Sequence, residues 1–433
     1  MIKKTINIIC FSIIIIIIGY NLLTKNNINI YSLILLTFLL LFIFYNNYHK
    51  KIIKNNKITI LALHLGIGGI EQYIYTLSQM LKDDYDIEII STYNLNNKIT
   101  YSFDKKIKIR YLINDYPHKE EFYTSLKNKN ILLTIKNGIK LFKILLLKHY
   151  LNIKEIRKIN SKYIITTRSF HNRIVSFFKN KNIIAIATEH NYHNNDKKYI
   201  NNLIKSCINI DYLVLVSEDL QSFYEDKFKN KKTKCLYIPN VIEKIPPYKE
   251  KNIINYNLVS IGRLSYEKGF DDLIDIIEMV KEEIPQVHLD IYGDGSEKNN
   301  LKKKINDMNL KNNITICGFY PHEELIKKLP NYDIYVMTSY TESFGIVLLE
   351  AMSNSVPCIA FDSANGAKIL LKDNRGVLVR NRDKNIFSSE IITLLKDKEK
   401  INTITKKAYD YSQKYDINRI KNEWLKMLKK ISK

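Results

Sequence analysis

Two glutamates, Glu342 and Glu350, stand eight residues apart in the chain. The apolar residues 333–337 before them predict a strand, and the apolar, helix-forming residues 344–352 predict a helix. We therefore expect Glu342 at the loop and first helical turn, beside unpaired backbone N–H groups. Because each helical residue turns by about 100°, Glu350 returns to nearly the same face. The spacing predicts that both carboxylates reach one cleft.

A simpler interpretation makes Glu342 an N-terminal helix charge and Glu350 a solvated residue. The neighbours of Glu350 argue against it, because apolar residues surround that carboxylate on nearly every side: Ile346, Val347, Leu348, Leu349, Ala351 and Met352. A carboxylate in such a run is expected to be desolvated and to need a partner.

The residues around these acids, 339–345 through Val356 and Pro357, resemble the E-x7-E signature of the retaining glycosyltransferases of family 4. Three further segments resemble that family's motifs in the expected order: Gly66–Glu71 the glycine loop after the first strand, Ser260–Leu264 with Lys268 and Gly269 the G-R-L and K-G block, and Tyr292–Gly295 the G-D-G turn. The resemblance covers about residues 57–431. It implies the α/β GT-B fold, in which two Rossmann-like domains face a cleft.

The resemblance also implies roles for the acidic and cationic residues. Arg263 and Lys268 would hold the diphosphate of a nucleotide-diphosphate sugar, a UDP-sugar being the expected donor. Glu350 would bind the donor ribose and Glu342 the hydroxyls of the transferred sugar. The alternative for Arg263 and Lys268 is a pair of surface cations near a turn.

Backbone groups and one histidine complete the expected site. The amides of Phe344 and Gly345 would lie beside the sugar, with Gly293 in the G-D-G turn. Gly68 and Gly69 would admit the diphosphate close to the backbone. His190 follows a predicted strand and resembles the histidine that the family places near the sugar, although a lone histidine is more often structural.

The family retains anomeric configuration by same-face attack with the leaving phosphate as base, so no side-chain nucleophile is expected. We expect no metal and no cofactor, because cations neutralise the leaving diphosphate instead. The one close Asp-x-Asp, residues 84–86, precedes a predicted strand and is interpreted as a solvated turn. Glu71 occupies the position where a dinucleotide fingerprint has its third glycine, which disfavours a nicotinamide site.

The chain departs from the family pattern at Gly366–Ile369, where members commonly have Gly-Pro-x-Glu. The absent glutamate leaves the role of that loop open.

The first 50 residues differ in kind from the rest. Residues 5–23 and 28–45 are uncharged runs of 19 and 18 residues, each long enough to cross a bilayer. Lysines lie mostly outside the pair, which predicts a transmembrane helical hairpin with both ends in the cytoplasm. A signal peptide, or one span plus an interfacial segment, are the alternatives; no small-residue cleavage site follows the first run.

The remaining chain alternates strands and helices, which predicts parallel sheets with crossover helices. We expect transmembrane helices in residues 1–55, an acceptor-binding domain in 56–245, a nucleotide-sugar-binding domain in 246–400, and helices crossing back to the first domain in 401–433. The five cysteines are dispersed, which indicates a reducing compartment.

The formal charge of +23 fits an anionic membrane surface or diphosphates, or a diffuse compositional bias. No nucleic-acid-binding motif accompanies the lysines, so nucleic acid is not an expected partner. Residues 140–158 form a basic amphipathic pattern. Packing on the sheet with solvated lysines is favoured over contact with lipid.

These features together predict a glycosyltransferase at the cytoplasmic membrane, with its catalytic domains on the cytoplasmic side. It would move a hexose-type sugar to a lipid-linked or cell-envelope saccharide. The alternatives are a GT-B-fold nucleotide-sugar epimerase, or a membrane-anchored binding protein with a degenerate site.

Overall fold

A computed structural model describes residues 53–66, 68–95 and 101–432. The two runs of the predicted transmembrane hairpin, residues 5–23 and 28–45, lie outside these residues. Of the range 1–55 assigned to the hairpin, only residues 53–55 are described, and the first strand begins there at Lys54. Among the helices of the described ranges, none combines the length and apolar character that a membrane crossing needs.

The first domain is built on a seven-stranded sheet in which every paired strand runs parallel, in the order β3-β2-β1-β4-β5-β6-β7. Its strands are β1 (Lys54–Ala62), β2 (Asp86–Tyr93), β3 (Lys108–Ile113), β4 (Ser161–Thr166), β5 (Ile184–Glu189), β6 (Tyr212–Leu215) and β7 (Lys234–Tyr237). In β1 the polar start is exposed and the last five residues are all buried. Such continuous burial is typical of a parallel strand with helices on both faces.

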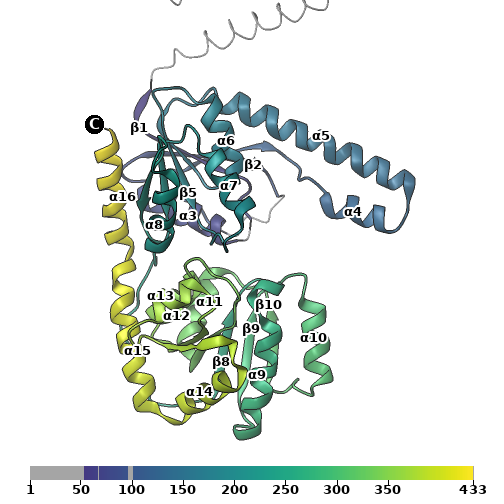
Figure 1. Cartoon of the computed structure of the whole chain (residues 1–433), viewed down its shortest axis with the longest axis vertical. Helices are drawn as coiled ribbons and strands as arrows, with labels where there is room; N and C mark the ends of the chain where they lie inside the picture. The colour runs from purple at the N-terminus through teal and green to yellow at the C-terminus, as the bar shows by residue number, and fades with distance from the viewer. Residues whose placement is uncertain (1–52, 67, 96–100, 433) are drawn as a thin grey trace, which may run out of the picture.

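Six helices connect these strands: α3 (Gly69–Leu81), α4 (Lys119–Lys127), α5 (Ile131–Ile156), α6 (Ser169–Phe178), α7 (Lys197–Ser206) and α8 (Glu218–Phe228). Four of them lie close to the sheet, whereas α4 and most of α5 project sideways as a helical hairpin (Figure 1). We call α4 and α5 together the arm.

The second domain has a parallel six-stranded sheet in the order β10-β9-β8-β11-β12-β13. Its strands are β8 (Asn257–Ile261), β9 (His288–Tyr292), β10 (Ile314–Gly318), β11 (Ile334–Met337), β12 (Cys358–Phe361) and β13 (Val377–Val379). Its helices are α9 (Phe270–Glu283), α10 (Lys298–Asp307), α11 (His322–Lys328), α12 (Ile346–Ser353), α13 (Asn365–Leu371), α14 (Lys384–Lys396) and α15 (Lys398–Ser412), with 3₁₀ turns at Tyr266–Lys268, Leu329–Asn331, Arg380–Arg382 and Gln413–Tyr415.

Both sheets have the strand order of nucleotide-binding α/β folds, and the prediction of two Rossmann-like domains is confirmed. The domains lie one above the other, and their facing loops meet at the carboxyl ends of the strands (Figure 1). Ligands bind at that edge in open parallel sheets.

The last helix, α16 (Ile417–Ser432), returns to the first domain. It buries Trp424 in the core beside β1 and α3, and the Tyr163 hydroxyl donates to the Leu428 carbonyl at 2.9 Å. By contrast, α15 packs on α12 and α14 of the second domain. The segment 401–433 therefore crosses between domains only from Ile417 onward, because the apolar face of α15 is already buried against the second sheet's helices.

The arm differs from the sequence expectation. The segment 140–158 belongs to a 26-residue helix, and only its later half packs on the first domain, for example through Ile144 and Ile156. The earlier half packs on α4 alone, where Asn137 donates to the Glu121 carbonyl at 3.2 Å. Its remaining face is exposed and apolar. The packing favoured from sequence for residues 140–158 is therefore observed over the later half of α5, and the earlier half, which the prediction did not cover, extends beyond the sheet.

Candidate active site

The loop after β11 carries Glu342, and its geometry differs from the expected helix start. The helix α12 begins at Ile346, and Gly345 precedes it with a left-handed φ of 80°. A left-handed residue interrupts helical geometry, and glycine adopts it without strain. Glu342 therefore lies in the loop and not in the first turn. The two acids do not share a helix face; the loop carries one and the helix the other.

Glu342 is paired with Lys268. The Lys268 Nζ lies 2.6 Å from Glu342 Oε2, and the two side chains are 24% and 19% exposed. Lys268 ends the 3₁₀ turn Tyr266–Lys268, and α9 begins after it, at Phe270. The Tyr340 N–H donates to the Glu267 carbonyl at 2.9 Å, which ties the two loops together. The pair is thus positioned by backbone contact as well as by charge.

Arg263 lies on the loop after β8 and is exposed. Its guanidinium forms no hydrogen bond or ion pair within the described parts of the chain. The pKa of Glu267 is lowered, mainly by a hydrogen bond from Ser265 and to a smaller degree by the charge of Arg263. The G-D-G turn packs against this loop so tightly that a Cβ at Gly293 would overlap the Gly262 carbonyl. Glycine is therefore required there, and Arg263 remains available to an external anion.

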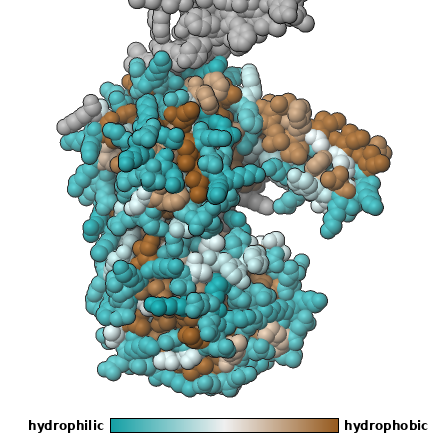
Figure 2. Space-filling model, in the orientation of Figure 1, coloured by the Kyte–Doolittle hydropathy of each residue, from teal (hydrophilic) through white to brown (hydrophobic). Residues whose placement is uncertain are grey.

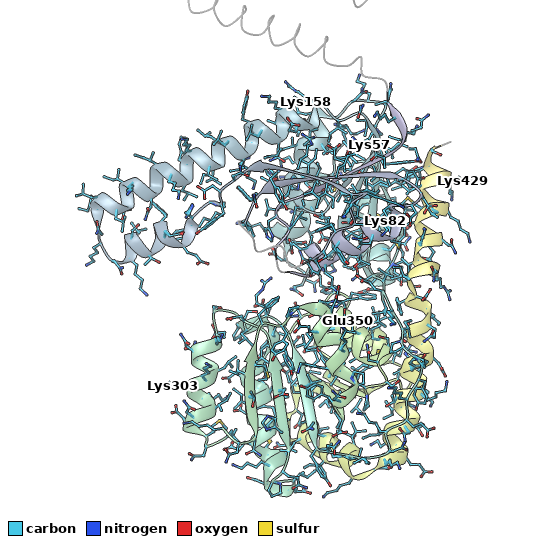
Figure 3. All side chains as sticks on the ribbon, turned by 180° about the vertical axis from the view of Figure 1, so that it is seen from behind. Lys57, Lys82, Lys158, Lys303, Glu350 and Lys429 are labelled. Atoms are coloured by element: carbon cyan, nitrogen blue, oxygen red, sulfur yellow. The ribbon has the colours of Figure 1, made fainter. Side chains whose placement is uncertain are left out.

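Glu350 lies on α12 and is buried where the two domains meet (Figure 3). His322 Nε2 lies 2.7 Å from Glu350 Oε1, and the side-chain amide of Gln72, in α3 of the first domain, donates to the same oxygen at 3.1 Å. Burial lowers the pKa of His322, but the Glu350 carboxylate outweighs this and the net shift is upward. The expected desolvated carboxylate with a partner is present.

The glycine loop of the first domain precedes α3. A Cβ at Gly68 would overlap the Glu71 carboxylate, whereas a Cβ at Gly69 would meet no atom within 4 Å. Glu71 is buried, and its Oε1 lies 3.0 Å from the Arg168 guanidinium and 3.6 Å from His64 Nδ1. Any need for glycine at position 69 must therefore come from a ligand and not from the protein.

His190 directly follows β5, as expected. Its Nε2 lies 2.9 Å from the Thr188 hydroxyl, and its ring packs on Tyr73 with 4.1 Å between centroids. Burial, aided by the Arg168 charge, lowers the pKa of His190 to about 3. The imidazole is therefore neutral at pH 7. The Ser343 hydroxyl donates to the His190 carbonyl across the interface.

The segment that lacks the family's glutamate, residues 366–369, lies in α13 and supports the loop of Glu342 through its backbone. The Gly366 N–H donates to the Glu342 carbonyl at 2.9 Å, and a Cβ at Gly366 would lie 2.5 Å from the Phe344 carbonyl carbon. Phe344 itself is buried edge-on against Tyr415. Through these contacts the start of α13 positions the backbone that carries Glu342.

The structure brings the predicted residues to one junction between the domains. Second-domain loops carry Arg263, Lys268, Glu342, Phe344, Gly345 and Gly293 to the carboxyl edge of their sheet, and first-domain elements supply Gly68, Gly69 and His190 from the opposite side. Sequence reasoning missed Gln72 and His322, because each lies in an ordinary helical start with no motif. Their proximity to Glu350 arises only from tertiary packing.

Three carboxylates of α9 lie close enough to share a cation: Asp271, Asp272 and Asp275. Each forms an ion pair with a cation, from Lys304, Arg382 or Lys384. Their charge is thus balanced within the protein.

Residues 239–411 match the protein family described as "Glycosyl transferases group 1". A Haemophilus influenzae protein named "Uncharacterized glycosyltransferase" is 26% identical over 85% of this chain and 98% of its own length. The Bacillus subtilis poly(glycerol-phosphate) alpha-glucosyltransferase is 26% identical over 61% of this chain, a match that spans 40% of that relative. The Staphylococcus aureus poly(ribitol-phosphate) alpha-N-acetylglucosaminyltransferase is 31% identical over 39% of this chain, a match that spans 34% of that relative.

Solved structures share the fold. A Staphylococcus aureus TarM complex with UDP superposes with a TM-score of 0.70 at 18% identity, covering 86% of this chain and 99% of that one. Anabaena HepE in complex with UDP and glucose superposes with a TM-score of 0.66 at 17% identity, covering 87% of this chain and 100% of that one.

Proposed function

Because the chain is a glycosyltransferase with a GT-B-like fold, we propose that it moves a hexose-type sugar from a UDP-sugar to a lipid-linked or cell-envelope saccharide with retention of configuration. The proposed reaction uses neither metal nor cofactor. Two relatives are named for glucosyl or N-acetylglucosaminyl transfer to polyol-phosphate polymers, and two similar structures hold UDP. The word "alpha" in both relatives' names supports retention, because UDP-glucose and UDP-N-acetylglucosamine are themselves α-linked.

The observation that carries the proposal is the Lys268–Glu342 pair at the mouth of the domain junction. In the proposed reaction the bond between the anomeric carbon and the diphosphate oxygen breaks, and negative charge develops on that oxygen. Lys268 would move from Glu342 to the diphosphate, since a mobile ammonium can follow the charge. Glu342 would then be free to accept hydrogen bonds from the sugar hydroxyls.

Arg263 supports the same step. An exposed guanidinium without an intramolecular partner offers a fixed fork to phosphate oxygens. The acceptor hydroxyl would attack the anomeric carbon on the face that the diphosphate leaves, and the departing phosphate oxygen would take its proton. No protein nucleophile takes part, so the described side chains supply binding and charge neutralisation.

Glu350 would bind the ribose hydroxyls. His322 and Gln72 both contact Oε1 of this carboxylate. A ribose that binds Oε1 would compete with the Gln72 amide, which comes from the other domain. Binding of the donor is therefore coupled to the interdomain contact.

The acceptor and the location follow from the chain's charge and its predicted N-terminal segment. A net charge of +23 and two uncharged runs before residue 53 support a site at the cytoplasmic membrane surface. A tether there raises the effective concentration of a lipid-linked acceptor. Hexose identity, linkage and acceptor would be read from the products.

The test is a turnover assay on the full chain with a panel of UDP-sugars, with and without envelope saccharide extracts. Lys268→Ala should lower the rate by about 10²-fold or more, because one donor to the developing charge is lost. Lys303→Ala removes an exposed lysine of α10, away from the junction, and should leave the rate unchanged (Figure 3). Equal rates in both variants would refute the site, and a sugar epimerised without acceptor would identify a different reaction.

A further inference from the structure

The arm presents an apolar stripe that the rest of the described chain leaves uncovered. Its members are large and exposed, recurring every three or four residues along α5: Leu132 84%, Ile135 55%, Ile139 66%, Phe142 64%, Leu146 56% and Tyr150 61%. At this spacing they share one side of the helix. Figure 2 shows the apolar side chains gathered along the arm. We call this set the stripe.

The opposite side of α5 is already occupied. Gly138 lies against Phe122 of α4, and Asn152 accepts a hydrogen bond from Thr92 of β2 at 3.2 Å. Since these contacts fix the rotation of the helix, the stripe must point away from both α4 and the sheet. An exposed patch of this size marks an interaction surface.

The charges beside the stripe indicate what covers it. Lys136, Lys140 and Lys143 follow its edge and are exposed. Lys136 and Lys143 form no ion pair with any residue that the structure describes, and Lys140 reaches Asp115 at 3.7 Å. The only acid of α5, Glu155, is buried and paired with Arg110 and Lys158. The helix thus offers leucines, isoleucines and two aromatic rings beside lysines of which only Lys140 has an acidic partner among the described residues.

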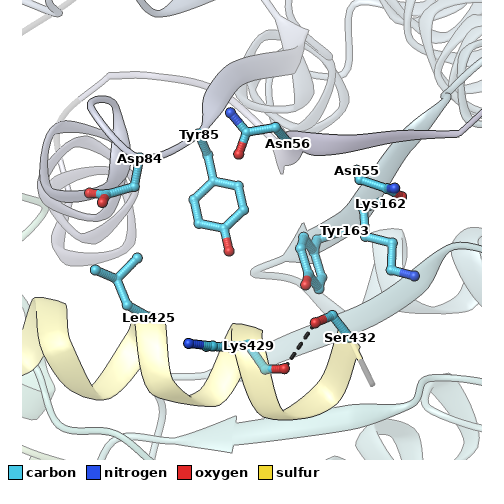
Figure 4. Close-up of a pocket in the computed structure, with 9 residues that line it drawn as sticks. All are labelled: Asn55, Asn56, Asp84, Tyr85, Lys162, Tyr163, Leu425, Lys429 and Ser432. Atoms are coloured by element: carbon cyan, nitrogen blue, oxygen red, sulfur yellow. Dashed lines mark hydrogen bonds between the residues drawn. The ribbon is translucent and has the colours of Figure 1, made fainter.

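The placement of the arm adds a second argument. Because the strands are parallel, their amino ends share the edge of the first sheet that faces away from the second domain. The described chain begins there at β1, and α5 returns to it just before β4 (Figure 1). A cavity of about 540 Å³ at this edge is lined by two cations, Lys162 and Lys429, and one acid, Asp84 (Figure 4). Two uncharged runs precede this edge in the sequence.

We propose that the stripe and its lysines dock the arm on the surface of an anionic lipid bilayer, so that α5 lies in the interface plane. An amphipathic helix with lysines flanking its apolar face binds there through buried apolar area plus attraction to anionic lipids. Lysines recur along α5 from Lys136 to Lys154, and charged side chains within a bilayer are costly, which favours a position in the interface plane. A second copy of the chain fits less well, because a symmetric pair would bring the lysine edges of two stripes together.

This inference deepens the proposed function, since it rests on a membrane-bound acceptor and places the acceptor-binding domain against the lipid. The arm would hold the first domain in a defined orientation, with the domain junction open to headgroup-linked saccharides. The arm does not contribute to the chemistry of transfer, so docking and turnover can fail separately.

The test places a reporter in the stripe of the full chain. Phe142→Trp is prepared beside the control Lys303→Trp, and each is reconstituted with phosphatidylcholine vesicles, with or without phosphatidylglycerol, containing lipids brominated on the acyl chain. The Phe142→Trp fluorescence should be quenched in anionic vesicles, and that of Lys303→Trp should not. The signal of the parent chain, whose single tryptophan is Trp424, is subtracted.

Charge is tested by adding Lys136→Glu and Lys143→Glu to the reporter chain. The loss of each lysine should weaken docking about fivefold, and the added glutamates should weaken it further, so quenching should fall. Turnover of a soluble UDP-sugar should stay unchanged. Quenching equal to the Lys303→Trp control, or association of chains through the stripe without quenching, would overturn the inference. Quenching without any transferase activity would refute the proposed function and leave the docking intact.

Discussion

The side-chain amide of Gln72 donates a hydrogen bond at 3.1 Å to Glu350, which lies 278 residues later and in the other domain. Glu350 is the residue proposed to bind the donor ribose, and one of its carboxylate oxygens, Oε1, accepts this bond. The contact joins α3 to α12 and links the position of the first domain to the state of the donor site.

Gln72→Ala should tighten donor binding. The variant removes a hydrogen bond to Oε1 that competes with the proposed ribose contact, and such a bond contributes about 0.5–1.5 kcal/mol. We expect the Kd for UDP to fall by up to about tenfold, measured by calorimetry. The matched control is Gln79→Ala on the same helix, whose side chain accepts from Lys82. A Kd raised by Gln72→Ala alone would mean that the amide contacts the donor instead of blocking it.

The His322–Glu350 contact should depend on pH. Burial alone lowers the pKa of His322, but the nearby Glu350 carboxylate raises it above its usual 6.5. A raised folded pKa adds stability that is complete below the unfolded pKa and is lost as pH rises through the folded value. His322→Gln should therefore lower Tm more at pH 6 than at pH 9.

The control for that prediction is a pair of chains that lack the carboxylate. Comparing Glu350→Gln with the double variant Glu350→Gln/His322→Gln should give no such pH-dependent difference in Tm. If the His322 effect has the same pH dependence in both backgrounds, another group causes it.

Arg263→Ala should separate activity from stability. The guanidinium has no hydrogen bond or ion pair among the described residues. The free energy of unfolding should therefore change by no more than about 0.5 kcal/mol, as for other exposed substitutions, and Tm should stay close to that of the parent chain. Donor turnover should fall by about 10²-fold, with partial recovery in Arg263→Lys. Arg173→Ala, at an exposed position of α6, should change neither. Loss of Tm with loss of activity would assign Arg263 to the fold.

Gly69→Ala tests whether the donor approaches the glycine loop. A Cβ there would meet no protein atom within 4 Å, so the variant should keep the parent Tm. If the diphosphate lies against this backbone, the added methyl should raise the Kd for UDP several-fold. Unchanged affinity would place the diphosphate elsewhere. Gly366→Ala gives the opposite pattern, because its Cβ would lie 2.5 Å from the Phe344 carbonyl carbon and should lower Tm.

The sequence by itself predicted most of the strands and the loops that carry the chemistry. The strand expected at residues 333–337 is β11 (Ile334–Met337), one residue shorter at its start, since a short apolar run between turn residues has a local cause. The same holds for Lys268 and Glu342, because parallel strands bring their carboxyl ends to one edge whatever the intervening chain.

Tertiary structure alone decided the rest. The left-handed Gly345 places Glu342 before α12, and no hydrophobic period reveals a single dihedral angle. Gln72 reaches Glu350 because the two domains pack together, and His322 reaches it because the second domain brings the start of α11 to α12. Neither residue type is unusual in a helix. The projection of α5 depends on which face α4 and the sheet already cover. Periodicity shows that a helix has an apolar face, but only the packed structure shows whether the protein buries it.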